Sequence, residues 1–254
     1  MDIKIIIAAH KAYRFPADAM YLPVHAGKTL HPELELGIQG DDAGENISEK
    51  NSNFCELTCL YWAYKNLQAE YVGLAHYRRH FARPGLGDKW QRILTEKQLE
   101  ALLQKAPVVL PKKRNYYIET NYQQYVHAHH REDLEQTQNI LRQYYPAYLP
   151  AYEKTMASTN GHRFNMFVMR QDLFRDYCQW LFDVLFKLEE RLDISGYSAY
   201  DARVFGFVAE RLLDVWLETN QLACVEVPVC NMENQHWGKK IAGFLKRKYS
   251  KKKE

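Results

Sequence analysis

A single stretch, YVGLAHYRR from Tyr71 to Arg79, joins a strand signal to a cluster of cationic side chains. Its first five residues form a short apolar run, which is typical of a strand buried on both faces of a parallel sheet. Polar and cationic side chains follow at once, from His76 to Arg79. In open α/β sheets ligands bind beyond the carboxyl ends of the strands, so this segment predicts a binding site.

Two adjacent arginines and a histidine make this strand end strongly positive. The planar guanidinium group matches phosphate oxygens in geometry and charge, so the cluster favours a phosphate ligand such as a diphosphate. The alternative is that Arg78 or Arg79 forms an ion pair with a carboxylate of the core. Both interpretations stay open at this point.

The rest of the chain alternates between strand and helix patterns. The Ile-rich run at 4–9 predicts a first strand, with His10 and Lys11 at its end. Further strands are predicted at 36–39, 71–75, 107–111, 164–169 and 223–229, and helices at 53–66, 94–104, 134–145, 171–192 and 201–219. Residues 14–28 are expected to form a loop. This alternation predicts an α/β fold with a mostly parallel central sheet flanked by helices.

Composition supports one folded domain, residues 1–238, followed by a basic tail, residues 239–254. Hydrophobic residues make up 46% of the chain, yet no run approaches the roughly 20 apolar residues that span a bilayer. The N-terminus does not resemble a signal peptide. The chain has five cysteines, an odd number, and no two of them have the CxxC spacing. This pattern favours free thiols and a cytoplasmic location. Cys55 and Cys59 are expected in the core, with metal or redox chemistry as the alternative.

The tail carries eight Lys or Arg and one Glu, a net +7, which leaves −4 on the other residues of a chain with an overall charge of +3. Such a tail could contact anionic lipid, remain solvated or bind nucleic acid. The apolar residues among the lysines favour an anionic membrane surface, contacted through 239–253. The acidic body argues against nucleic acid.

Two loops contain further candidates for binding. Asp41, Asp42 and Asn46 lie in a polar loop, GDDAGENIS at 40–48, whose carboxylates could bind a hard cation or sugar hydroxyls. The alternative is an ordinary turn that caps the following helix. Asn165, in GHRFNM at 161–166, could bind a sugar or a nucleotide through its amide.

The predicted helix at 201–219 carries a charged face. Arg203 and Glu210 are seven residues apart and therefore share that face, with Gly206 between them. A carboxylate in this position could be a general base, and Asp201 is a second candidate. The alternative is an internal Arg–Glu ion pair. The histidines in HAHH, 127–130, lack the HExxH arrangement and are expected on a loop or helix surface. The chain also lacks P-loop, GxGxxG and GxSxG motifs, which weakens kinase, dehydrogenase and hydrolase interpretations.

Taken together, these segments resemble a family first described as a domain of unknown function in bacterial capsule, exopolysaccharide and O-antigen gene clusters. One member of that family is assigned as a galactofuranosyltransferase. The resemblance extends from about residue 3 to residue 220 and rests on AAHKAY, YLPVHAGK, GDDAGENISEKNSNFCELTCLYWAYKN, YVGLAHYRRHF, VVLPKKRNYYIET, FNMFVM and RVFGFVAERLLDVWL. It implies a GT-A-like fold, UDP-galactofuranose as donor, and a lipid-linked glycan acceptor at the inner face of the cytoplasmic membrane.

The resemblance also implies inversion at the anomeric carbon, which needs one general base. Glu210 is the first candidate, Asp201 the second and Asp42 the third. The residues expected to bind the donor are His10, Lys11, Asp41, Asp42, Asn46, His76, Tyr77, Arg78, Arg79, Asn165 and Arg203.

The metal-binding DxD motif usual in GT-A enzymes has no clear counterpart in this chain. HYRR follows the strand where DxD is expected, so Arg78 or Arg79 could replace part of the charge of a metal ion. Asp41 and Asp42 stay candidates for binding Mg or Mn, and no cofactor is certain. Two alternatives to the galactofuranose activity remain. One is transfer from another UDP-hexose, such as UDP-galactopyranose or UDP-glucose. The other is a non-catalytic glycan-binding subunit of a polysaccharide synthase.

Overall fold

The structure, a computed structural model, describes residues 1–233. The predicted basic tail and the predicted domain boundary at 238 lie outside the described residues. The strands are β1 (Ile3–Ala9), β2 (Tyr21–His25), β3 (Gln39–Gly40), β4 (Tyr71–His76), β5 (Arg79–Phe81), β6 (Val108–Pro111), β7 (Arg114–Asn115), β8 (Asn160–Gly161), β9 (Phe167–Arg170), β10 (Cys224–Val227) and β11 (Val229–Asn231). The α-helices are α1 (Asn51–Phe54), α2 (Leu57–Asn66), α3 (Lys89–Arg92), α4 (Glu96–Leu103), α5 (Asn121–Val126), α6 (Arg131–Tyr144), α7 (Leu149–Ala157), α8 (Gln171–Glu189) and α9 (Val204–Thr219).

The main sheet has the strand order β10-β6-β9-β4-β1-β2-β3. Strand β1 is parallel to both of its neighbours, β2 and β4, and the pairs β2–β3 and β6–β10 are also parallel. Strand β9 is antiparallel to β4 and to β6. The predicted α/β architecture with a mostly parallel central sheet is therefore confirmed.

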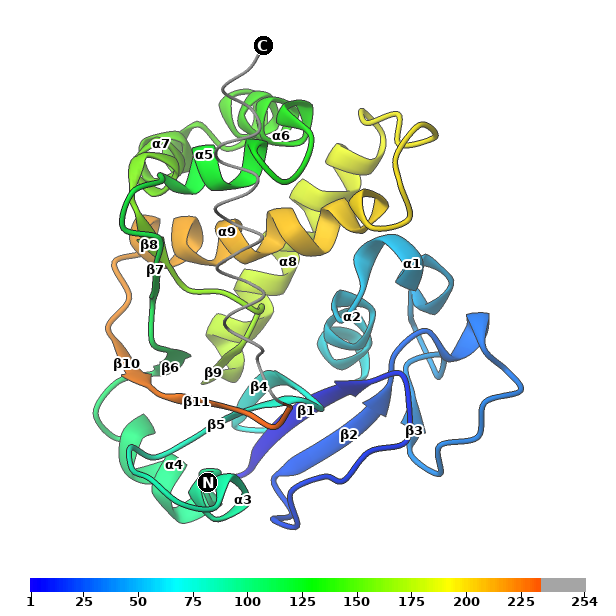
Figure 1. Cartoon of the computed structure of the whole chain (residues 1–254), viewed down its shortest axis with the longest axis vertical. Helices are drawn as coiled ribbons and strands as arrows, with labels where there is room; N and C mark the ends of the chain where they lie inside the picture. Colours follow the sequence, from blue (N-terminus) through cyan, green and yellow to red (C-terminus); the bar gives the residue numbers. More distant parts are fainter. Residues whose placement is uncertain (234–254) are drawn as a thin grey trace.

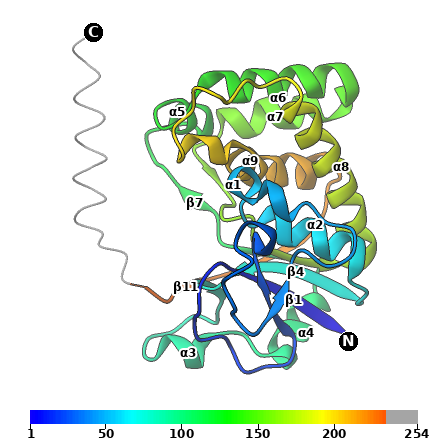
Figure 2. The ribbon, with the colours of Figure 1, turned by 90° about the vertical axis from the view of Figure 1, so that its right-hand side faces the viewer.

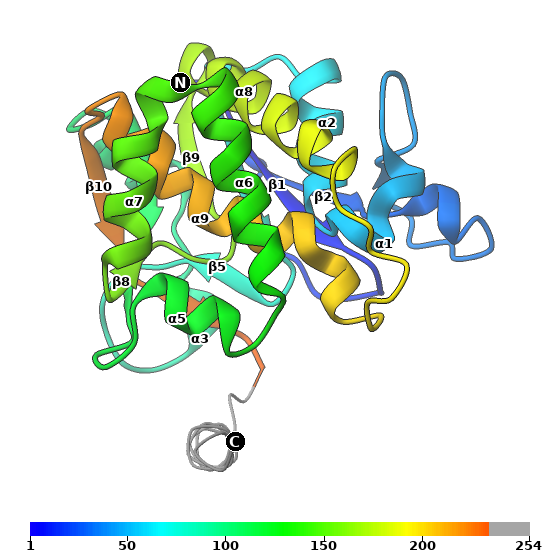
Figure 3. The ribbon, with the colours of Figure 1, turned by 90° about the horizontal axis from the view of Figure 1, so that it is seen from above.

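Helices cover both faces of this sheet. Alternate residues of the strands face opposite sides, so Ile6 and Leu74 enter one hydrophobic core while Ile5 and Ala75 enter another. In Figures 1 and 2, α2, α8 and α9 lie on one side of the sheet and α3 and α4 on the other. Figure 3 shows α6 and α7 as an outer layer over α8 and α9.

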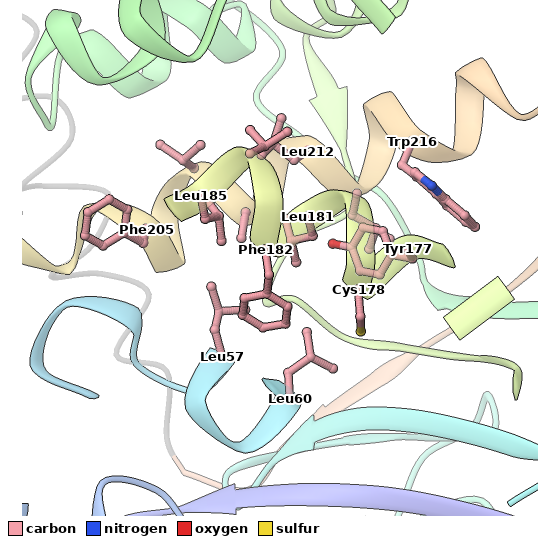
Figure 4. Packing of buried hydrophobic residues seen from close by; sticks show 14 of the residues in the cluster. Leu57, Leu60, Tyr177, Cys178, Leu181, Phe182, Leu185, Phe205, Leu212 and Trp216 are labelled. Carbon is pink, nitrogen blue, oxygen red and sulfur yellow. The ribbon is translucent and has the colours of Figure 1, made fainter. Parts of the chain in front are cut away.

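The larger core lies between the sheet and the long helices. Leu57 and Leu60 of α2 point toward Phe182 and Leu181 of α8, and all four side chains are almost fully buried (Figure 4). Burial of each such side chain contributes about 1.5–3 kcal/mol, so this packing fixes α2 against α8. Among the described residues, no helix is both long and apolar enough to cross a bilayer.

Proline explains two differences between the predicted and the observed elements. Strand β2 falls inside the predicted loop 14–28 and contains Pro23. The neighbouring β3 pairs only with Val24 and His25, so the missing N–H of Pro23 leaves no gap in that ladder. The predicted strand 223–229 is divided into β10 and β11 at Pro228.

Helix boundaries differ more where the backbone changes direction. The predicted helix 53–66 is broken at Cys55, whose φ of 53° is outside the helical range, so α1 and α2 are separate. Helices α3, α5 and α7 were not predicted. Helix α4 lies within the predicted range 94–104 and begins after Thr95, because Thr95 and Gln98 form a capping box.

Candidate active site

A cavity of about 790 Å³ lies at the carboxyl ends of β1 and β4. It is lined by residues from these strands, from the α1–α2 turn, from the segment before β9 and from α9. The lining residues are Ala8, His10, Ala26, His31, Asn51, Ser52, Cys55, Glu56, His76, Tyr77, Arg78, Arg79, Arg114, Tyr116, Gln124, His129, Arg163, Phe164, Tyr200, Arg203, Gly206, Phe207, Glu210 and Arg211. The cavity therefore lies at the sheet edge where the strand ends predict a ligand site.

The lining of this cavity is cationic. Its lining within residues 1–233 includes six arginines and four histidines but only two carboxylates, those of Glu56 and Glu210. Arginine is positively charged at every physiological pH, so the lining has an excess of positive charge without any histidine being protonated. An anionic ligand with several oxygen atoms fits this environment.

Arg78 and Arg79 differ in how they are held. The Nη1 atom of Arg78 donates to the Oε2 atom of Glu233 at 3.0 Å, and both side chains are 39% exposed. The Arg79 guanidinium lies 4.5 Å from the centre of the Phe164 ring and makes no hydrogen bond to any of the residues 1–233. Burial, together with the charge of Arg78, lowers the pKa of Arg79. The expected alternative, an ion pair with a core carboxylate, is absent for both arginines within the described part of the chain.

The histidines and the tyrosine of the site are positioned by neighbouring groups. His76 shares a 2.6 Å hydrogen bond between its Nε2 atom and the carbonyl oxygen of Phe164. His10 lies edge-on to the Tyr77 ring, with ring centres 5.1 Å apart. Burial and the nearby Arg78 lower the pKa of His10, so its imidazole is neutral at pH 7.

Two buried arginines form part of the wall. Arg163 donates to Asn121 Oδ1 and, from Nε, to the Tyr116 hydroxyl at 3.1 Å. Arg211 donates to the Phe207 carbonyl at 2.7 Å and to Gln124 Oε1 at 2.6 Å. Because these guanidinium groups are already bound to the protein, they act on a ligand mainly through their charge.

The two carboxylates of the cavity come from different helices. Glu210, on α9, accepts from the backbone N–H of Phe164 at 3.1 Å and from Arg211 Nη1 at 3.4 Å. Glu56, at the start of α2, accepts from Asn165 Nδ2 at 2.7 Å. Glu56 was not among the residues predicted from the sequence. Its signal was weak, a lone carboxylate directly before the apolar residues of α2.

The acidic loop at 40–48 is built as a structural turn. Asp41 is fully buried and accepts from the backbone N–H groups of Gly27 and Lys28 and from the hydroxyls of Ser48 and Thr58, at 2.5–3.1 Å. These contacts support the turn interpretation of the loop rather than the ligand interpretation.

The other two residues of this loop that were predicted to bind the donor are, like Asp41, outside the cavity lining. Asp42 is exposed, and Asn46 donates to the carbonyls of Asp42 and Gly44 at 2.9 Å. The structure thus does not bring Asp41, Asp42 and Asn46 together with the arginine cluster.

Three further predicted residues lie beside the lining rather than in it. Lys11 forms an ion pair with Glu233 at 3.7 Å. Asn165 is buried and holds Glu56, as described above. Asp201 accepts from the hydroxyl of Ser198 and contacts His129 Nδ1 at 3.1 Å. Arg203, by contrast, lines the cavity and donates from Nε to the Cys55 sulfur.

The HAHH segment is only partly the surface feature that was expected. His129 is largely buried, lines the cavity and stacks on Phe207 with ring centres 4.2 Å apart. All five cysteines are free, and Cys59 is in the core as predicted. Burial raises the pKa of the Cys55 thiol to about 11, so this thiol in the cavity wall stays protonated at neutral pH.

A divalent cation does not fit the side chains of this cavity. Among residues 1–233, no group of three or more His, Cys, Asp and Glu side chains is arranged to hold a metal ion. The two cavity carboxylates already accept hydrogen bonds, and the surrounding guanidinium groups would repel a cation.

Comparison with known proteins places the chain in a family. It belongs to the family described as a domain of unknown function, DUF4422, whose model matches residues 4–221. Among solved structures, it is similar to the apo structure of the bifunctional glycosyltransferase WbbM, with 33% sequence identity and a TM-score of 0.85. The alignment covers 92% of this chain and 46% of WbbM, so the chain spans about half the length of that protein. No curated protein gives a significant match. The predicted fold class is therefore confirmed as that of a glycosyltransferase structure.

Proposed function

We propose that this chain is a glycosyltransferase that moves a hexose from a nucleotide-diphosphate donor to a hydroxyl group of a glycan. The observation that carries this proposal is the arginine-lined cavity with two carboxylates, at the strand ends of a fold shared with part of WbbM. Such a cavity has the two elements that the reaction needs, cations for the diphosphate and a carboxylate for the acceptor hydroxyl.

The arginine cluster would bind the diphosphate and stabilise the leaving group. Arg79 can donate to phosphate oxygens without first losing a hydrogen bond to the described protein. Arg78 can do so by exchanging the carboxylate of Glu233 for a phosphate. As the sugar–oxygen bond breaks, negative charge grows on the departing nucleotide, and these fixed positive groups stabilise it. No step of this scheme requires a metal ion.

The specific donor that we propose is UDP-galactofuranose, with inversion at the anomeric carbon and a lipid-linked glycan as acceptor. The support is the family resemblance of the sequence, together with a cavity suited to a diphosphate. The basic tail would hold the enzyme at the inner face of the cytoplasmic membrane, where such acceptors lie. UDP-galactopyranose and UDP-glucose are the alternative donors, because a change from one hexose to another requires few changes in the protein groups that bind the sugar.

A direct assay tests this function. Purified protein is incubated with each of the three UDP-hexoses and a panel of synthetic glycan acceptors, with and without EDTA. We expect UDP release and an acceptor heavier by one hexose, with the highest rate for UDP-galactofuranose and no loss in EDTA. The same reactions with the Arg79→Ala variant serve as the control. A non-catalytic glycan-binding subunit would release no UDP with any donor, and that result would contradict the proposal.

A further inference from the structure

The backbone around Glu56 adopts an unusual conformation that turns this residue toward the cavity. The preceding residue, Cys55, has φ 53° and ψ −132°, a conformation rarely adopted by residues other than glycine. Asn51 holds the turn by donating from Nδ2 to the Cys55 carbonyl at 2.8 Å. Strained conformations of this kind persist where the surrounding structure enforces them, often at active sites.

A second strained segment faces Glu56 from the other side. Phe164 and Asn165 are consecutive non-glycine residues with φ of 78° and 52°. Asn165 donates from Nδ2 to Glu56 Oε1 at 2.7 Å and to the Gly206 carbonyl at 3.1 Å. The amide therefore ties the Glu56 side chain to helix α9. Two strained turns thus converge on one carboxylate.

The Glu56 side chain has no role in capping its own helix. It stands at the N-cap position of α2 but makes no capping hydrogen bond, and it lines the cavity with 13% of its surface exposed. Its Oε1 atom accepts from Asn165, whereas its Oε2 atom makes no hydrogen bond to the described residues.

Glu210, the other carboxylate of the cavity, is less suited to accept a proton from a substrate. One of its oxygen atoms accepts the N–H of Phe164 and the other contacts Arg211. Its carboxylate thus supports the strained segment at Phe164 and neutralises a buried arginine. A proton taken from a substrate would weaken these contacts, because protonation removes the charge that attracts Arg211 and the Phe164 N–H.

We infer that Glu56 is the general base of the transfer reaction, and this inference rests on the proposed function. The Oε2 atom of Glu56 takes the proton of the acceptor hydroxyl while the hydroxyl oxygen forms a bond to the anomeric carbon. The bond between that carbon and the diphosphate oxygen breaks, and its electron pair leaves with the nucleotide. The proton passes from Glu56 to solvent after the product departs. Glu210 and Asn165 are positioning residues.

The test compares three isosteric variants, Glu56→Gln, Glu210→Gln and Glu49→Gln. Glu49 is exposed, lies seven residues before Glu56 and serves as the matched control. For each variant, kcat for sugar transfer, the Kd for UDP, the melting temperature and the pH profile of kcat are measured. Wild-type protein that transfers no sugar would contradict the proposed function itself, separately from the choice of base.

With an active wild type, we expect Glu56→Gln to lower kcat by at least about 100-fold, because loss of a general base costs roughly 10²–10⁴ in rate. Its UDP affinity should stay within about threefold of wild type, and the fall of kcat at acid pH should disappear. Glu210→Gln should lose less than about tenfold in kcat, and Glu49→Gln should be unchanged. A folded Glu56→Gln variant with more than a third of wild-type kcat would overturn the inference.

The Glu56→Asp variant, which has a shorter side chain, provides a second test if Glu56→Gln does not fold. Glu56→Asp keeps the charge but withdraws it by one methylene group. We expect kcat to fall by about tenfold or more, with the decline at acid pH still present, because a base must lie within hydrogen-bond reach of its proton. Wild-type kcat in this variant would overturn the inference.

Discussion

Removal of the Arg79 guanidinium tests the diphosphate site most selectively. In the Arg79→Ala variant the cavity loses a cation that breaks no hydrogen bond to residues 1–233 when it binds a phosphate. A hydrogen bond to a charged group contributes about 1.5–3 kcal/mol. Taking a net loss of about 2–3 kcal/mol, we expect the affinity for UDP to fall roughly 30- to 150-fold.

Arg78→Ala should have a smaller effect than Arg79→Ala. Arg78 must leave Glu233 before it can bind phosphate, and an ion pair as exposed as this one contributes at most about 1 kcal/mol. Subtracting this cost from the roughly 2–3 kcal/mol taken for Arg79 leaves about 1–2 kcal/mol, so we expect the affinity for UDP to fall roughly 5- to 30-fold. The assay is titration calorimetry with UDP at low and high salt. Arg170→Ala is the control, because Arg170 is exposed and pairs with Asp172 outside the cavity lining. Wild-type affinity in a folded Arg79→Ala variant, or a larger loss for Arg78→Ala, would refute this reasoning.

Three further predictions concern stability and the tail. The buried His80 makes no side-chain hydrogen bond within the described chain, and burial lowers its pKa to about 4. As the pH falls, the His80 imidazole is therefore protonated in the unfolded chain at a higher pH than in the folded protein. The free energy of unfolding should consequently fall by about 3 kcal/mol from pH 7 to pH 4. Urea unfolding at both pH values should show this component in wild type but not in His80→Phe, and equal pH dependence in both would argue against it. A Cβ atom at Gly73 would lie 2.6 Å from the Phe167 carbonyl oxygen, so Gly73→Ala should lower the free energy of unfolding, measured by thermal unfolding, by about 3 kcal/mol. Gly196→Ala is the control and should leave it unchanged, because Gly196 has open space around it. Deletion of residues 239–254 should weaken binding to anionic vesicles, more at low salt than at high salt, and unchanged binding would leave the tail merely solvated.

The architecture could be predicted because its signals are local. The strands β1, β4, β6 and β9 are short apolar runs, and α8 and α9 have long stretches with helical spacing of apolar residues. Strand β2 gave no such signal because Pro23 interrupts it, although its position beside the short β3 accommodates the proline. The break at Cys55 was also hidden, because the strained turn is held by a side-chain hydrogen bond from Asn51 and by a tertiary contact from Arg203.

The candidate site could be predicted where the strand-end rule applies. Four of the predicted residues lie at the carboxyl ends of β1 and β4, namely His10, His76, Arg78 and Arg79. The strand-end rule therefore predicts that they meet at one edge of the sheet. Asp41 was predicted to bind a cation or the donor, because acidic loops often bind ligands. In the structure its carboxylate instead accepts hydrogen bonds from buried backbone N–H groups. Glu56 was missed because a turn without a periodic pattern brings it to the cavity.

The central claim is that the cationic cavity supports transfer of a hexose from a nucleotide donor. The most direct measurement is the mass of a defined glycan acceptor after incubation with UDP-galactofuranose, compared between wild type and Arg79→Ala. We predict a product heavier by one hexose, formed with equimolar UDP, and much slower formation by the variant at limiting donor. An acceptor of unchanged mass with every UDP-hexose, from folded protein that still binds UDP, would contradict the claim.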